Sequence, residues 1–229
     1  MQKLIGIIGG TGKEGVGIAS RLVQSGENVC IGSRDPNKSE MISRKLRKIN
    51  PNLIIQSATN LETAKISDLL FLTINPNGIE QLISDIKPYL DNKIIVDTTV
   101  PLKYSNGKFS HIEWPNGSSS LHIQALIPSA KVVSGFHTIS AKDLNNLKQE
   151  INQDVFLASN DRVAKTKIFK IVNKIPNLRA IDCGNLDVSK YLESCTLLLL
   201  NINQIYSKKN KNTTHTGLKL SGLSKTENL

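Results

Sequence analysis

One segment near the start of the chain, "KLIGIIGGTGKEG", limits the fold more than any other. The apolar run at residues 3–9 predicts a strand. The residues at 10–15 match the pattern GxGxxG, and residues 12–25 have apolar side chains at helical spacing. A glycine-rich turn that joins a strand to a helix is typical of folds that bind dinucleotides. The N–H groups at the start of such a helix bind phosphate, so we expect a pyrophosphate there.

Each glycine of this turn has a separate expected role. Gly10 would permit the tight turn, Gly12 would let the backbone approach the pyrophosphate, and Gly15 would let the helix pack on the strand. Thr11 and Lys13 complete the predicted phosphate loop. Solvation in place of phosphate contact is the alternative for Lys13.

The end of the second predicted strand, in "NVCIGSRDPNK" (28–38), indicates which dinucleotide binds. The adenosine ribose is contacted about 20 residues beyond the glycines, where this chain has Ser33 and Arg34. A carboxylate there would repel a 2′-phosphate, whereas a guanidinium is permanently charged and matches phosphate oxygens. Lys38 adds a second cation, and Asp35, which precedes a proline, is interpreted as a helix N-cap. We therefore expect NADP rather than NAD.

Strands and helices alternate along the chain, which predicts an α/β fold with a Rossmann-type, doubly wound parallel sheet. The strands are expected at 3–9, 29–31, 53–57, 68–74, 93–99 and 131–140. Between the last two, residues 100–120 are expected to be irregular. A smaller C-terminal α/β portion follows, with strands at 154–158 and 179–183 and helices at 161–174 and 188–206. We place the boundary near residue 140, giving an NADP-binding domain at 1–140 and a smaller domain at 141–229.

The net charge of +10 does not by itself indicate a nucleic-acid partner. The cations concentrate in "SRKLRK" (43–48) and in a basic tail from residue 207 to residue 229, without interleaved aromatic side chains. A nucleic-acid-binding domain usually collects its charge on one element and carries a recognisable motif. We therefore interpret these charges as solvated surface and expect no nucleic acid.

The three cysteines, Cys30, Cys183 and Cys195, are widely spaced and include no CxxC pair. This pattern indicates reduced thiols in a cytoplasmic protein, and neither a disulfide framework nor a zinc site. No cluster of metal-ligand residues is visible, so no metal is expected. No apolar run approaches the ~18 residues needed to cross a bilayer, so no membrane association is expected either.

Several of these motifs together resemble the NADP-dependent oxidoreductases of the deazaflavin coenzyme F420. The similarity begins with "GGTG", "GSR" and the lysine that follows. It continues in "VPL" after the fifth strand and in "GSSS" (117–120), "VVSGFHTISA" (132–141) and "HTGLKLSGL" (215–223). The resemblance implies that NADP and coenzyme F420 both bind, and that a hydride passes directly between C4 of the nicotinamide and C5 of the deazaflavin. In such a reaction the cofactors supply the chemistry and the protein aligns them, so no catalytic residue is expected.

The resemblance also indicates where the two reacting rings would lie. It implies that His137 and Thr138 lie beside the nicotinamide, with a packed or capping histidine as the alternative. Thr73, Ile74 and Asn75 end the fourth predicted strand, where they would flank the nicotinamide ribose. Residues 100–120 and 188–206, with the region around His137, would hold the deazaflavin.

The chain departs from the family pattern at two positions. The family commonly has Ile-Pro and then Trp after the fourth strand, whereas this chain reads Ile74-Asn75-Pro76-Asn77. The usual Asn-Leu of the glycine turn is replaced by Lys13-Glu14. The first departure bears on the shape of the deazaflavin pocket.

Two other function classes stay open at this point. One is an NADP-dependent reductase of a small imine or carbonyl substrate, which usually has a long helical dimerisation domain that residues 141–229 do not suggest. The other is a non-catalytic NADP-sensing module, which would need no second pocket. Finally, "CTLLLLNI" (195–202) is apolar almost all round, which predicts a homodimer through the 188–206 helix. Burial of both faces within one subunit is the alternative.

Overall fold

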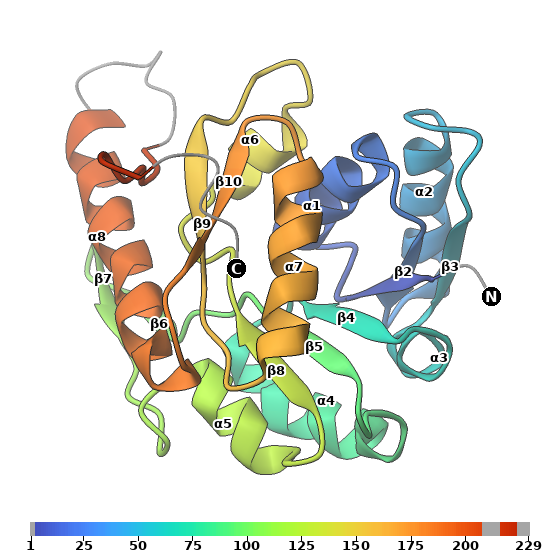
Figure 1. Ribbon diagram of the computed structural model, residues 1–229, viewed down its shortest axis with the longest axis horizontal. Coiled ribbons are helices and arrows are strands. Elements are labelled where there is room, and N and C mark those ends of the chain that lie inside the picture. Colours follow the sequence, from blue (N-terminus) through green and yellow to red (C-terminus); the bar gives the residue numbers. More distant parts are fainter. Residues whose placement is uncertain (1–2, 208–215, 224–229) are drawn as a thin grey trace.

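The computed structural model describes residues 3–207 and 216–223 (Figure 1). Six parallel strands form its central sheet in the order β3-β2-β1-β4-β5-β8. Their bounds are β1 Ile5–Ile8, β2 Val29–Ser33, β3 Ile55–Thr59, β4 Leu69–Leu72, β5 Ile94–Asp97 and β8 Lys131–Ser134. The order reverses between β1 and β4, and folds of this kind bind ligands at the carboxyl ends of the strands near such a point. The predicted doubly wound fold is confirmed.

Helices cover both faces of the sheet, which is why its central strands are continuous apolar runs. One core contains buried side chains of α1, α2 and α7, and the other contains those of α3, α4 and α5. The bounds are α1 Lys13–Gln24, α2 Pro36–Arg47, α3 Asn60–Ile66, α4 Ile79–Ile86, α5 Ser119–Leu126 and α7 Arg162–Lys174. Short 3-10 turns lie at Pro76–Gly78, Lys87–Tyr89 and Leu186–Val188.

The C-terminal portion packs directly onto the sheet domain. Its strands, β9 (Gln153–Leu157) and β10 (Leu178–Asp182), pair in parallel, and α8 (Ser189–Ser207) follows. The short helix α6 (Ala141–Asn145) lies against α1, where the buried Arg21 donates from Nε to the Leu144 carbonyl and from Nη2 to the Asp143 carbonyl. Arg21 thereby satisfies carbonyls at the end of α6 that have no helical partner.

The structure corrects three sequence expectations. Residues 100–120 are not irregular throughout, because β6 (Leu102–Ser105) and β7 (Lys108–His111) form an antiparallel hairpin. Its turn is Asn106-Gly107, both with positive φ, which is the turn that an Asn-Gly pair favours. Helix α5 was not expected. The last strand of the sheet ends at Ser134 rather than at residue 140, because the chain turns at Phe136, whose φ is 70°.

Helix α8 lies at one side of the molecule, next to the β6–β7 hairpin (Figure 1). Among the described helices, none combines the length and the apolar character needed to span a bilayer. Most of the expected basic tail, from residue 207 onward, lies outside the described residues.

Candidate functional site

The turn between β1 and α1 brings three parts of the chain into close contact. Gly9 has a φ of +74°, which glycine adopts at little cost. A Cβ atom on Gly15 would lie 2.6 Å from Thr73 Oγ1 and 2.7 Å from the Gly10 Cα, so only glycine fits between α1 and β4. The N-cap, Gly12, offers no side-chain cap to α1. The N–H groups of the first turn are therefore available to an anion.

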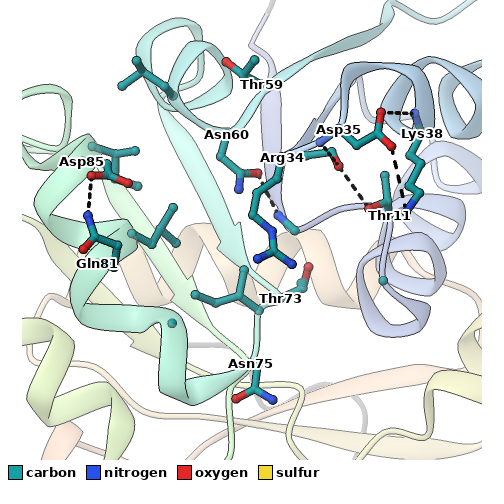
Figure 2. Close-up of a pocket in the computed structure, with 18 residues that line it drawn as sticks. Thr11, Arg34, Asp35, Lys38, Thr59, Asn60, Thr73, Asn75, Gln81 and Asp85 are labelled. Atoms are coloured by element: carbon teal, nitrogen blue, oxygen red, sulfur yellow. Dashed lines mark hydrogen bonds and ion pairs between the residues drawn. The ribbon is translucent and has the colours of Figure 1, made fainter.

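A cavity of about 720 Å³ opens beyond this turn, at the carboxyl ends of β1, β2 and β4 (Figure 2). The predicted site residues that line it are Thr11, Gly12, Ser33, Arg34, Lys38, Thr73, Ile74 and Asn75. Gly10 lies in the turn itself and Gly15 in the first turn of α1, and neither lines the cavity, while Lys13 is exposed outside it. The structure thus gathers most of the predicted dinucleotide residues from three separate segments.

The end of β2 presents a cation to this cavity. The Arg34 side chain points into it, toward Thr73 (Figure 2), and has no hydrogen bond or ion pair with the described part of the chain. The Ser33 hydroxyl accepts the Asp35 N–H at 3.1 Å and lies 3.3 Å from Thr11 Oγ1. Asp35 caps α2 as predicted, since its carboxylate accepts from the N–H groups of Asn37 and Lys38. The Arg34 guanidinium and the Ser33 hydroxyl at the end of β2 are groups that can bind a phosphate ester.

Asp35 and Lys38 also interact with each other. The Lys38 Nζ lies 3.9 Å from Asp35 Oδ2 at the surface, a contact that contributes little to stability. The Asp35 carboxylate is thereby turned to the helix and to this lysine, while Arg34 remains unpaired among the described residues. Arg34 and Lys38 both line the cavity, at the end of β2 and the start of α2.

Several residues of the cavity wall were not predicted. Asn60, at the start of α3, accepts the Gly9 N–H on Oδ1 at 3.2 Å and so supports the glycine turn. Its place directly after the third strand was the sequence signal that could have revealed it. Asn75, which was predicted, caps the 3-10 turn that follows it, because its Oδ1 accepts the Asn77 N–H. The other unpredicted lining residues include Thr59, Leu61, Gln81 and Asp85.

A second cavity, of about 280 Å³, lies where β5 and β8 end, under α8. His137 and Thr138 both line it, together with Glu14 from α1. The His137 carbonyl accepts a hydrogen bond from Thr196 Oγ1 at 2.8 Å, which connects the loop after β8 to α8. Burial lowers the pKa of the His137 ring to about 4, so the ring is neutral at pH 7. Its Nε2 is buried and has no partner within the described residues.

A buried acidic cluster that the sequence did not reveal adjoins His137. Carboxylate oxygens of Asp97 and Glu193 and a ring nitrogen of His137 lie within 4.8 Å of one another. Asp97 accepts hydrogen bonds from Thr99 Oγ1 at 2.6 Å and from Ser120 Oγ at 2.7 Å. Asp97, Glu193 and His137 are residue types that can bind a metal, although no metal site was expected. The Asp97 oxygens, however, already accept hydrogen bonds from the hydroxyl groups of Thr99 and Ser120.

Glu193 joins two helices at this cluster. Its carboxylate faces the N–H groups of Ser119 and Ser120 in the first turn of α5, at 3.2 and 3.4 Å. Burial, and secondarily the charge of Asp97, raises the pKa of the Glu193 carboxyl to about 8. The single carboxylic acid of α8, two residues before its apolar run at 195–202, was the signal that could have identified it.

Comparison with known proteins is consistent with this geometry. The family described as "NADP oxidoreductase coenzyme F420-dependent" matches residues 4–101. The F420-dependent NADP reductase of Methanocaldococcus jannaschii is 32% identical over 225 residues, which cover 96% of this chain and 98% of the relative. That of Methanothermobacter marburgensis is 32% identical over 205 residues, covering 87% and 92%. A solved structure from Arthrobacter sp. FB24, described as a candidate F420-dependent NADP reductase, has a TM-score of 0.78 at 22% identity and covers 96% of this chain and 100% of that one.

Proposed function

Because this chain belongs to the family of coenzyme F420-dependent NADP oxidoreductases, we propose that it transfers a hydride reversibly between NADP(H) and coenzyme F420. The observation that carries the proposal is the similarity over nearly the whole length of both chains. The protein is then an oxidoreductase with two dissociable cofactors, NADP and F420, as its substrates.

We propose that the larger cavity holds NADP. The N–H groups of the first α1 turn would bind the pyrophosphate, and Arg34, with Ser33 and Lys38, would bind the 2′-phosphate. Two observations support this assignment: the Arg34 guanidinium has no partner among the described residues, and the Ser33 hydroxyl beside it is buried. The residues proposed to contact NADP are Gly10, Thr11, Gly12, Lys13, Gly15, Ser33, Arg34, Lys38, Thr73, Ile74, Asn75 and His137.

The deazaflavin is proposed to bind on the side of the second cavity. This cavity adjoins the carboxyl ends of β5 and β8, and α8 forms its opposite wall. The protein's role in the transfer is to bring the two reacting carbons to ~3–3.5 Å and to exclude water. A neutral His137 suits a face against which an aromatic ring packs, because it adds no charge there. Pro76, which lies one residue later than the proline of the family pattern, begins the 3-10 turn at the edge of the larger cavity.

A homodimer is proposed through α8. Tyr191, Leu198, Ile205 and Tyr206 are all exposed along this helix, each by more than half of its surface. Apolar side chains at this spacing form a stripe, and another protein surface commonly covers such a stripe. We further propose a cytoplasmic location, which the three free cysteines support, and a domain boundary near residue 140.

The decisive experiment mixes purified protein with NADPH and oxidised F420 and follows the loss of deazaflavin absorbance. Matched reactions contain NADH in place of NADPH, or FMN, FAD, an imine or a 2-oxo acid in place of F420. We expect turnover with NADPH and F420, and little with the other pairs. Turnover of an imine or carbonyl without turnover of F420 would contradict the proposal, and so would NADP binding without turnover of any acceptor.

A further inference from the structure

Glu14 is a carboxylic acid placed where the chain departs from its family. It is the second residue of α1, directly behind the glycine turn, and it lines the second cavity. Its Oε1 atom is buried and has no hydrogen-bond partner within the described residues. Buried polar atoms are nearly always paired, so an orphaned carboxyl oxygen beside a cavity indicates a ligand group that pairs with it.

A second unsatisfied group lines the same cavity. His137 is only 8% exposed, and its buried Nε2 also has no partner in the part of the chain that the structure describes. The remaining lining residues are neutral, including Thr98, Thr138, Thr196, Asn203 and Thr216. Among the described residues, one acid and one neutral histidine are therefore the titratable groups that line this 280 Å³ space.

The charged groups near Glu14 do not fix its protonation state, so a bound ligand can change it. On α1 its neighbour Lys13 is exposed, and the charged residues of α6 are the exposed Lys142 and the buried Asp143. Asp97 and Glu193 lie within 4.8 Å of a ring nitrogen of His137 but do not line the cavity, and the residues of α8 that line it are neutral. Burial raises the pKa of the Glu14 carboxyl to about 8, so the free protein holds it mostly protonated at pH 7.

The proposed reaction requires a proton donor, which a protonated Glu14 could be. Reduction of the deazaflavin by NADPH consumes one proton, and it converts a neutral nicotinamide ring into a cation. A neutral carboxyl can supply that proton, and the carboxylate that remains would attract the cationic ring strongly in a site with few competing charges. Tuning a buried acid to a pKa near neutrality is what acid–base chemistry at pH 7 needs.

We propose that Glu14 is the acid–base residue of this reaction, a role that rests on the proposed function. Glu14 donates its proton to the ring nitrogen that receives the displaced electron pair, as the C4–H bond of NADPH breaks and the C5–H bond of the deazaflavin forms. The O–H bond of Glu14 breaks in this step, and water protonates the carboxylate afterwards. In the opposite direction the carboxylate takes the same proton back. Ionisation of Glu14 and oxidation of the nicotinamide are thereby linked, and the linkage is reciprocal.

The linkage can be measured by binding alone, without turnover. Dissociation constants of NADP+ and NADPH are determined from pH 6 to pH 9.5 for the wild type, Glu14→Gln and Glu150→Gln. Glu150 is exposed and serves as the matched control for the same chemical change. Since both nucleotides carry the 2′-phosphate, its own titration cancels in the ratio of the two constants. The wild-type preference for NADP+ should rise about tenfold or more as the pH rises through 8.

Glu14→Gln should give a ratio that does not change with pH, and Glu150→Gln should behave as the wild type. Glu14→Leu, which introduces the residue common in the family, should also give a constant ratio, and thermal unfolding shows that each variant is folded. In the deazaflavin assay, Glu14→Gln should lower kcat and remove the decline in rate above pH 8. A wild-type slope retained in Glu14→Gln would overturn the assignment. A slope that requires Glu14, without any F420 turnover, would refute the proposed function and leave the coupling to nicotinamide standing.

Discussion

Arg179 and Asp154 form a two-point ion pair across the β9–β10 sheet. Nε of Arg179 lies 2.8 Å from Oδ1 of Asp154, and Nη2 lies 2.6 Å from Oδ2. The same carboxylate accepts the Leu220 N–H at 2.7 Å, and Arg179 donates to the carbonyls of Leu220 and Leu223. The pair therefore attaches the segment at 216–223 to the body of the protein.

Asp154→Asn should destabilise the protein by roughly 3–5 kcal/mol, because it removes the buried carboxylate from the two-point ion pair with Arg179. Burial acts to raise the pKa of the Asp154 carboxyl, but the hydrogen bonds from Arg179 and Leu220 outweigh it, so this pKa lies below its ordinary value. Its contribution is then fully present above about pH 4 and is lost as the pH falls through the folded-state pKa. Urea unfolding at pH 7 and at pH 3 measures both effects. The exposed Asp187→Asn is the control, and equal losses in the two variants would contradict the prediction.

Glu193→Gln should make the protein more stable at alkaline pH. The folded-state pKa of about 8 lies above the ordinary value of 4.5, so the folded protein retains a proton that the unfolded chain loses. Stability therefore falls as the pH rises from about 5 to 8. Glutamine needs no such proton and can still accept from the first turn of α5, while its amide can donate to Asp97. We expect a gain of roughly 1–3 kcal/mol at pH 8 and almost none at pH 4. A gain that does not depend on pH would show that another effect is responsible.

Arg34→Ala should weaken NADPH binding about ten- to hundredfold, in line with the loss of hydrogen bonds to a charged group, and leave the weaker binding of NADH nearly unchanged. Arg44→Ala is the control, because Arg44 lies in α2 outside the cavity and is paired with Glu40 at 2.8 Å. Isothermal titration with both nucleotides distinguishes the outcomes. A wild-type protein that binds NADPH and NADH equally well would refute the assignment of Arg34.

Leu198→Glu should convert the proposed dimer into a monomer, since it places a charge in the middle of the exposed stripe of α8. Leu198 is 55% exposed in the single chain, so the substitution does not disturb the core. Val163→Glu, at a residue that is 73% exposed on α7, is the control. Light scattering at micromolar concentration gives the mass of each variant. If the wild type is already a monomer under these conditions, the proposed interface is wrong.

The parts of this protein that depend on neighbours in sequence could be predicted from the sequence. The GxGxxG turn, the alternation of strands and helices, and the Asp35 cap before Pro36 each involve only a few consecutive residues, and each lies where it was expected. Arg34 follows the same logic, because its distance from the glycines along a strand determines where it emerges. The Asn106-Gly107 hairpin was equally local and was missed only because its turn signal was not used.

Helix α5 was missed for a different reason. It is short and mixes serine, histidine and apolar residues without a clear apolar stripe, so its sequence does not favour a helix strongly. Ser118 caps its first turn locally, and the Glu193 carboxyl group from α8 holds the same turn from outside. Such tertiary contacts override weak local preference.

The sequence by itself determined the fold class, the glycine turn and the cationic end of the larger cavity, because spacing along the chain specifies them. Only the tertiary structure decided that Glu14 and His137 line one cavity, and that Asp97 and Glu193 meet behind it. These residues come from α1, β5, α8 and the loop after β8, and no local pattern encodes how such elements dock. Their contact depends on how whole buried faces pack, and the same burial removes their carboxyl groups from water and changes what they can do.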